Sequence, residues 1–250
     1  MIESSISAEK KFELSRTETY ITKHYVFHYQ PGTLAEKEIK EIAQIQERAF
    51  SRICGVLGVC YPERINYYFT DSPVEIGSIF WDQGTSCNGC AVCGDNKVYA
   101  VYNEDVKCIG EHEDTHLIAH LIGEPASSFL SEGLAMYFHA NWWGVPNEDW
   151  AAYYKEQYPR ISVEAMLDND QFSEHGEEIT YPVAGAFTRF LIDTYGMNPY
   201  KELYKYGGME YSERIKSIYH VSLQEIEQTF WNAMAQCVFD SNKLAAMSQR

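Results

Sequence analysis

Basic residues are scarce in this chain, and long apolar runs are missing. Its 250 residues include 20 Lys and Arg against 36 Asp and Glu, which gives a formal net charge of −16. This balance argues against a nucleic-acid binder, because such proteins neutralise phosphates with a basic face. No apolar run approaches the roughly 18 residues that span a bilayer, so we expect no membrane span. Internal repeats, low-complexity blocks and a long Pro/Gly/Ser linker are also missing.

The start of the chain lacks the features of a signal peptide. Met1 to Lys11 carry neither a basic start nor an apolar block. We therefore expect a cytoplasmic chain with reduced thiols, and a secreted chain whose leader has been removed is the alternative. The seven cysteines do not suggest a disulfide framework, because the count is odd and such frameworks are typical of much shorter secreted domains.

Apolar residues make up 45% of the chain and aromatic residues 14%, which is enough to build a hydrophobic core. Aromatic and β-branched residues over 20–29, and alternating apolar residues over 65–69 and 98–102, predict three strands. Between the first two strands, apolar residues recur every three or four positions over 33–57. This spacing predicts an amphipathic helix that ends at Gly58.

After about residue 104 the pattern becomes helical almost throughout. The predicted helices cover 105–122, 129–141, 147–157, 181–195, 198–205 and 222–238. Strands first and helices afterwards favour an α+β fold: a small N-terminal sheet with a helix, a central helix and a mostly helical C-terminal part. We predict an N-terminal tail over 1–18 and a single domain over 19–240, with its sheet at about 19–104 and its helices at about 105–240.

One short motif carries chemistry, the sequence His-Glu-Asp-Thr-His at 112–116, an HExxH pattern. His112 and His116 are four positions apart and share one helix face, so both imidazoles can reach one metal ion. Glu113 can hydrogen-bond a metal-bound water and take its proton. Asp105 is the predicted cap of this helix. A surface helix that happens to carry histidines is the alternative.

A second helix supplies a candidate third ligand, which a zinc site needs. Residues 129–138 carry a single carboxylate, Glu132, on an otherwise apolar helix. Burying a charge without a partner is costly, and a metal ion is a natural partner. Gly123 and Pro125 break the chain between the two helices, and Gly133 permits a close helix–helix approach.

HExxH followed by Glu-Gly-x-Ala resembles the gluzincin zinc metallopeptidases, the group that includes thermolysin and the zinc aminopeptidases. The chain looks most like the short bacterial peptidase MA-like proteins, which carry a P-x-x-L-x-E-G-x-A stretch and later a Tyr before an apolar helix ending in Tyr-Gly. The corresponding residues here are Pro125, 130–135 and 181–196. The resemblance covers the layout of about 20–235, and its specific part is 112–135.

The resemblance implies a thermolysin-like architecture with one zinc ion (Zn2+) per chain. It implies His112, His116 and Glu132 as zinc ligands and Glu113 as general base, the four residues that the chemistry of the motifs also selects. Zinc lowers the pKa of its bound water, the base takes the proton, and the water attacks a polarised carbonyl. Tyr181 matches the recurrent tyrosine, a donor to the oxyanion; its alternative is a core tyrosine at a helix start.

The sequence also departs from the gluzincin pattern. Met136 stands where some gluzincins carry an Asp that orients a zinc histidine, so another residue must serve as outer partner, and His139 is a candidate. His139 and His175 are further candidates for the oxyanion donor. His116 with His120 could form the metal pair instead, but that pair would have no adjacent base.

Three cysteines, Cys87, Cys90 and Cys93, are spaced by three, and Cys108 follows further on. They could hold a second metal ion or a cluster, but three thiolates in one loop fall short of the paired CxxC spacing of zinc ribbons. A reduced or partly oxidised loop is the favoured interpretation. In the resembling enzymes a strand such as 97–102 pairs with extended substrate, so the loop could cover the site.

Together these patterns predict a zinc-dependent peptidase of gluzincin type that hydrolyses bonds in peptide or protein substrates. The alternative is a catalytically weak or inactive zinc-binding relative that acts in peptide binding or regulation. Glu113 argues against it, because a pure binding site has no need of a base. A cysteine-loop redox or metal-storage protein would leave Glu132 unexplained.

Overall fold

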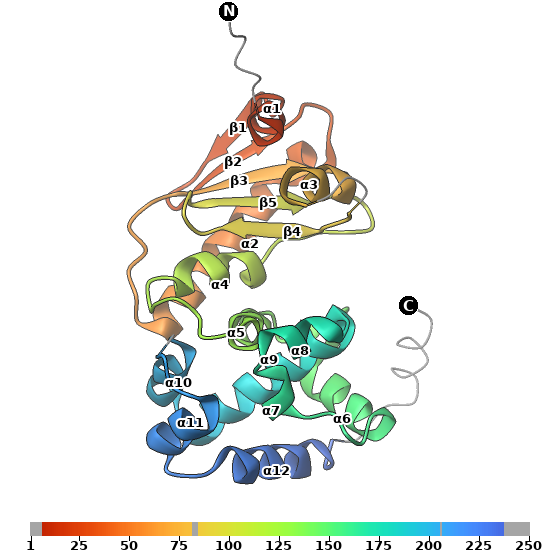
Figure 1. The fold of residues 1–250 in the computed structure, drawn as a ribbon. Coiled ribbons are helices and arrows are strands. Elements are labelled where there is room, and N and C mark those ends of the chain that lie inside the picture. The colour runs from red at the N-terminus through yellow and green to blue at the C-terminus, as the bar shows by residue number, and fades with distance from the viewer. Residues whose placement is uncertain (1–6, 82–84, 206, 238–250) are drawn as a thin grey trace, which may run out of the picture. The chain divides into compact units, whose positions relative to one another are not determined.

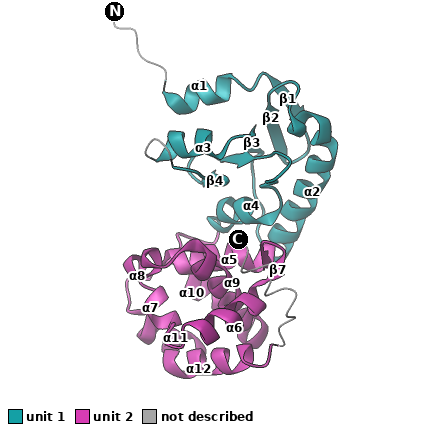
Figure 2. Cartoon of the chain, turned by 90° about the vertical axis from the view of Figure 1, so that its right-hand side faces the viewer, with its two compact units in different colours: residues 1–121 teal, residues 122–250 magenta. Residues whose placement is uncertain are grey.

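The computed structural model describes residues 7–81, 85–205 and 207–237 (Figure 1). Residues 1–6 of the predicted tail lie outside this part, as do 238–240 at the end of the last predicted helix and of the predicted domain. The chain divides into two compact units, 1–121 and 122–250 (Figure 2).

Unit 1 contains a mixed sheet of five strands. Across the sheet these are β1 (Glu18–Ile21), β2 (Tyr25–Tyr29), β3 (Ile65–Thr70), β5 (Lys97–Val101) and β4 (Gly89–Val92). The outer pairs β1–β2 and β5–β4 are antiparallel, and β2–β3 and β3–β5 are parallel. Residues 20–29 were predicted as one strand, and this is wrong. The Thr22 N–H donates to the Tyr25 carbonyl at 3.0 Å, so the chain turns there and forms a hairpin.

The described residues of unit 1 form the helices α1 (Ala8–Leu14), α2 (Leu34–Leu57), α3 (Pro73–Phe80) and α4 (Glu111–Ala119). The prediction of α2 is confirmed. Thr33 caps it by accepting a hydrogen bond from the Glu36 N–H, and Gly58 ends it at a left-handed φ of 62°. Helix α3 is not predicted by the sequence pattern; its proline lies at the first helical turn, where a missing N–H costs nothing.

The sheet of unit 1 is buried on both faces. Tyr67 of β3 packs near Tyr25 and Phe27 on the face covered by α2. Its neighbour Tyr68 points to the opposite face, as successive residues of a strand do. A hydrophobic cluster on that face joins the sheet to α1 and α3; its buried members are Phe12, Tyr68, Ile76, Tyr99 and Val101.

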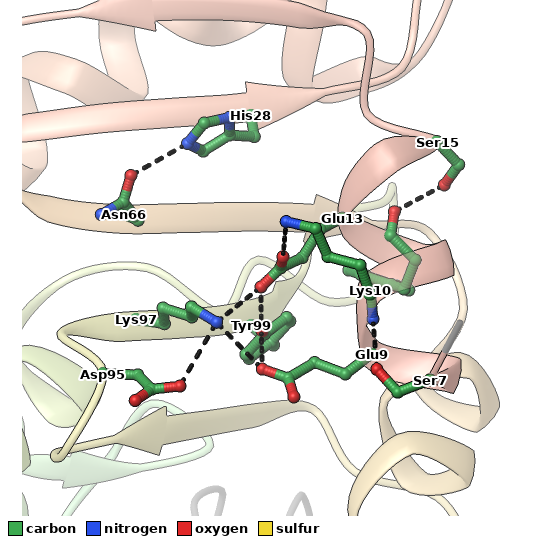
Figure 3. A network of polar contacts seen from close by, with 11 residues as sticks. Ser7, Glu9, Lys10, Glu13, Ser15, His28, Asn66, Asp95, Lys97 and Tyr99 are labelled. Atoms are coloured by element: carbon green, nitrogen blue, oxygen red, sulfur yellow. Dashed lines mark hydrogen bonds and ion pairs between the residues drawn. The ribbon is translucent and has the colours of Figure 1, made fainter. Parts of the chain in front are cut away.

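A charged network fastens α1 to the sheet (Figure 3). The Lys97 ammonium lies 2.7 Å from Glu13 and 3.1 Å from Glu9, both on α1. The Tyr99 hydroxyl lies 2.8 Å from the same two carboxylates. The hydrogen bond that Glu13 accepts from Lys97 lowers its pKa against the opposing effect of burial, so this carboxylate is ionised where it meets the sheet.

The HExxH helix is shorter than predicted, and its predicted cap at Asp105 is wrong. The Asn103 side chain accepts hydrogen bonds from the backbone N–H groups of Asp105 and Val106, at 2.9 and 2.7 Å. These bonds make a turn, because an Asn side chain can satisfy the N–H groups that follow it. The helix α4 therefore begins only after Gly110, which occupies the N-cap position.

Unit 2 is mostly helical. Its elements are α5 (Ser128–His139), the short strands β6 (Asn141–Trp142) and β7 (Val145–Pro146), α6 (Asn147–Gln157), α7 (Val163–Met166), α8 (Asn169–Glu174), α9 (Glu177–Tyr195), α10 (Met197–Tyr204), α11 (Tyr211–Tyr219) and α12 (Leu223–Met234). A mixed sheet with helices followed by a mostly helical part confirms the α+β prediction. Within the described ranges, the helices all fall short of the length and apolar character that a membrane crossing requires.

Helices α5 and α9 of unit 2 approach closely through two glycines. A Cβ on Gly133 would lie 2.9 Å from the Ala184 carbonyl oxygen, and one on Gly185 would lie 2.6 Å from the Met136 Cβ. A Cβ at either position would overlap atoms of the facing helix, so the close contact between α5 and α9 requires glycine at both positions. The close approach predicted at Gly133 is therefore present, and its partner is α9.

Candidate metal site

The three side chains predicted to bind zinc lie on two helices, His112 and His116 on α4 and Glu132 on α5. One possible ligand atom from each lies within 4.8 Å of the other two, and all three side chains are partly buried. This group could hold a metal ion. Among the described residues, no other set of His, Cys, Asp and Glu side chains has this geometry.

The donor set fits a transition metal. The rings of His112 and His116 lie with centroids 5.1 Å apart, on the helix face that their four-residue spacing predicts. Two imidazoles and a carboxylate are a ligand combination that zinc uses in catalytic sites, and other divalent transition metals accept similar donors. These donors could therefore hold a divalent metal ion, and they do not identify which one.

A buried glutamine holds the start of α4. The Gln46 side chain on α2 is fully buried, and its oxygen accepts a hydrogen bond from the Gly110 N–H. Its amide nitrogen lies 3.3 Å from the Gly110 carbonyl oxygen and 3.1 Å from Asp114 Oδ2. One side chain thus binds both backbone groups of the residue that precedes α4 and a carboxyl inside that helix.

The Asp114 carboxyl, between the two histidines of the motif, is fully buried. The Tyr25 hydroxyl lies within hydrogen-bonding distance of Asp114 Oδ2 and 3.0 Å from the Gln46 backbone carbonyl. A hydroxyl has one hydrogen, so it cannot donate fully to both. Burial raises the pKa of Asp114 well above its usual range. A protonated Asp114 would donate to the tyrosine oxygen, and the hydroxyl would then donate to the Gln46 carbonyl.

The predicted base, Glu113, is buried, with 8% of its surface exposed. The backbone of β4 passes directly against its carboxylate at Gly89, and Cys108 lies at the same point: a Cβ on Gly89 would be 2.4 Å from Glu113 Oε1 and 2.6 Å from Cys108 Sγ. Burial raises the pKa of the Cys108 thiol well above its usual range, so this neighbour of the base is neutral.

Part of the cysteine segment, where the sequence suggested a loop, forms the strand β4, and Cys87 and Cys93 lie on either side of it. Cys90 lies in β4, and it packs with Cys87 against the hydrophobic cluster on the α1 and α3 face of the sheet. Burial raises the pKa of Cys90 to about 12. Cys93 is exposed, and its Sγ lies 3.6 Å from the His116 carbonyl oxygen. The segment thus serves as a structural edge of the sheet beside α4.

Helix α5, which carries Glu132, is fixed within unit 2 by contacts with three other helices. The Tyr200 hydroxyl on α10 lies 3.1 Å from the Leu130 carbonyl oxygen. The Asn147 side chain at the start of α6 donates to the Met136 carbonyl at 2.9 Å. With the glycine contacts to α9, these bonds hold both ends of the turn that bears Glu132.

Tyr181 lies in α9, and its ring packs against Trp142 and Phe172, with centroids 5.5 and 6.2 Å away. Its role as oxyanion donor stays a prediction.

The other predicted histidines lie at helix ends, and their roles also stay predictions. His139 is the last residue of α5, and His175 follows α8. His120 follows α4 and is exposed. The group that could hold a metal contains His112 and His116, not His120.

Three residues around the site were not predicted from the sequence: Gln46, Tyr25 and Gly89. A signal for Gln46 exists, because it continues the apolar series of α2 four positions after Ile42 and seven before Ile53. A polar residue on an apolar helix face needs a buried partner. No comparable signal marks Gly89.

Comparison with models of protein families gives no match to this chain, and comparison with curated proteins gives none either. The resemblance to gluzincins therefore depends on the residues of α4 and α5 and on the geometry of their side chains.

Proposed function

We propose that the chain is a zinc-dependent peptidase of gluzincin type, with Glu113 as its general base. The observation that carries this proposal is the convergence of His112, His116 and Glu132, with Glu113 next to the first of them on the same helix. Three protein ligands leave a fourth position for water in catalytic zinc sites. Zinc bound there would supply Lewis acidity and acidify a coordinated water.

The proposed chemistry of the protein side chains is proton transfer and charge stabilisation. Glu113 takes a proton from the attacking water and delivers it to the leaving amine. The Glu113 carboxylate is buried beside the Gly89 backbone and the neutral Cys108 thiol, so little bulk water can reach it. Tyr181 donates a hydrogen bond to the developing oxyanion in this proposal.

The outer edge of the sheet supports a peptide substrate. β4 is the last strand of the sheet, and the Val101 N–H of β5 donates to the Asn88 carbonyl at 2.8 Å. Antiparallel pairs alternate between bonded and non-bonded, so the backbone groups of Gly89 and Ala91 point away from β5. The Cys87 thiol reaches the Gly89 carbonyl from that side, at 2.8 Å.

An exposed strand edge binds extended peptides through backbone hydrogen bonds. Three backbone groups of β4 point away from β5 and could pair with such a peptide: the Gly89 N–H and the Ala91 N–H and C=O. Because Gly89 also lies against Glu113, a peptide paired with β4 would run beside the proposed base. This arrangement favours a peptide over a small-molecule substrate.

The first experiment measures metal content and hydrolysis together. Protein purified without chelator should carry one zinc ion per chain, and His116→Ala and Glu132→Ala should lose it. His120→Ala is the matched control, because the same change at the C-cap of α4, four positions after His116, should leave the zinc in place. Glu113→Gln should keep zinc and lower hydrolysis of a peptide library about 10²–10⁴-fold. Glu111→Gln, which removes an exposed ion pair with Arg52, should keep most activity.

Three results would contradict the proposal in different ways. Zinc retained in His116→Ala would reject the metal site. Hydrolysis by Glu113→Gln at the parent rate would reject the base. One zinc per chain with no hydrolysis of any peptide would favour the zinc-binding relative that acts in peptide binding or regulation.

A further inference from the structure

We propose that Gly89 is a positioning residue for Glu113: the missing side chain at position 89 leaves the space that the carboxylate of the base occupies. The role of Glu113 as a base rests on the proposed function. The contact between Gly89 and Glu113 rests on the geometry of unit 1 alone. Gly89, Cys108 and Glu113 all belong to that unit.

The space around Gly89 is too small for any side chain. A Cβ there would lie 2.4 Å from Glu113 Oε1, 2.9 Å from Glu113 Cδ and 2.6 Å from Cys108 Sγ. Carbon atoms do not approach such neighbours closer than about 3 Å without displacing them. The strand backbone at Gly89 is not in the left-handed region. Space, and not backbone conformation, is therefore what requires glycine here.

The carboxylate is the group that would move if a side chain were added. The backbone of β4 is fixed by its antiparallel pairing with β5. The Cys108 backbone is held by its N–H, which donates to the Val101 carbonyl at 2.9 Å, and its Sγ, 2.6 Å from the added Cβ, can turn away by rotation about one bond. Glu113 has three rotatable bonds, and its Oε1 lies nearest to the added atom.

A displaced carboxylate loses the proton-transfer geometry. A general base must lie within about 3 Å of the water that it deprotonates. A shift of about 1 Å at a reacting group can cost about 100-fold in rate. The metal ligands His112 and His116 are not among the atoms nearest to a Cβ at position 89, so zinc binding should survive the same change.

The test compares two glycines of one hairpin. Gly89→Ala should keep one zinc per chain and the parent KM within about twofold, while kcat falls about 100-fold. Gly94→Ala is the matched control, because a Cβ there meets nothing within 4 Å, and it should keep the parent kcat. A Gly89→Ala enzyme with unchanged kcat, or one that changes only KM, would overturn the inference. The second result would assign Gly89 to substrate pairing.

A shorter base should remove the effect. Glu113→Asp withdraws the carboxylate by one methylene, so Gly89→Ala in that background should change kcat less than about twofold. The same loss of about 100-fold in both backgrounds would overturn the inference, because the two positions would then act independently.

A crystal structure of Gly89→Ala separates this inference from the proposed function. The Glu113 carboxylate should be displaced by more than about 1 Å while the backbone of α4 stays in place. An unmoved carboxylate would overturn the inference. A displaced carboxylate in a chain whose parent form hydrolyses no peptide would uphold the contact and reject the peptidase.

Discussion

The two helices that carry the candidate ligands are held in their units by different forces. Helix α4 of unit 1 depends on buried hydrogen bonds: Gln46 binds Gly110 and Asp114, and Tyr25 lies against the same carboxyl. Helix α5 of unit 2 depends on close packing, with Gly133 and Gly185 bringing it against α9. The first arrangement is sensitive to lost partners, and the second to added volume.

This difference follows from sequence composition. The nine residues of α4 include five that ionise, and its buried face contains Asp114, so apolar contact cannot anchor it alone. The twelve residues of α5 are mostly apolar and fully buried on one side. A polar helix needs specific partners because a buried group without one costs about 1–3 kcal/mol.

The largest effect is expected from Gln46→Met. This change keeps the length of the side chain and removes its polar atoms, so the Gly110 N–H loses its partner and Asp114 keeps the contact with Tyr25 but loses the one with Gln46. We expect a loss of about 3 kcal/mol, which corresponds to a fall in Tm of roughly 6–12 °C. Gln44→Met, at an exposed position of the same helix, should change stability by less than about 0.5 kcal/mol. Calorimetry of both variants measures their Tm values. Equal values would show that α4 does not depend on the buried hydrogen bonds of Gln46.

A smaller and opposite pair of effects should distinguish the glycines. Gly133→Ala places a Cβ 2.5 Å from Thr188 Oγ1 and 2.9 Å from the Ala184 carbonyl oxygen, and overpacking of this kind costs about 1–3 kcal/mol. Gly55→Ala lies in α2 with nothing within 4 Å, so helix propensity should raise stability by up to about 1 kcal/mol. Urea unfolding of both variants measures the two signs. A stable Gly133→Ala would show that packing does not limit α5.

The smallest effect concerns acid. Burial lowers the pKa of His28, so the folded state binds a proton less readily than the unfolded chain, whose histidine titrates near about 6.5. Unfolding therefore takes up a proton, and stability falls as the pH drops below that value.

His28→Phe should weaken this dependence, because it removes the titrating group and keeps the stack on Tyr68, whose ring centroid is 4.3 Å away. The Tm of His28→Phe minus the Tm of the parent should increase by about 1–2 °C as the pH falls from 7.5 to 5.5. If this Tm difference is the same at both pH values, His28, one of the polar residues of unit 1 in Figure 3, adds no acid sensitivity to the fold.

The sequence predicts the long periodic elements well and the short ones poorly. Helix α2 was correct because its apolar spacing spans 24 residues between a threonine cap and a glycine stop. Strand β4 was missed, since its residues are Gly-Cys-Ala-Val and glycine and alanine rarely favour strands. Helix α4 was drawn too long, because the side-chain hydrogen bonds of Asn103 override the apolar pattern before Gly110.

The members of the candidate site were predicted more readily than their surroundings. His112, His116 and Glu132 stand in two short motifs whose spacing carries their chemistry. Their supports are long-range: Gln46 lies 64 positions from Gly110, and Tyr25 lies 89 positions from Asp114. The apolar spacing of α2 marks Gln46 as a buried polar residue, but a single sequence does not show which distant group it contacts, so only the folded chain reveals the partners.

The Gln46 bridge also bears on the order of events during folding. A helix of nine residues, such as α4, is too short to persist alone in water. Its stability depends on Tyr25 of β2 and Gln46 of α2, so we expect it to become stable only when these two elements pack against it. The two imidazoles of the motif thus share one face late in folding. A metal ion would be captured by a finished scaffold, and would not template that scaffold as it does in a zinc finger.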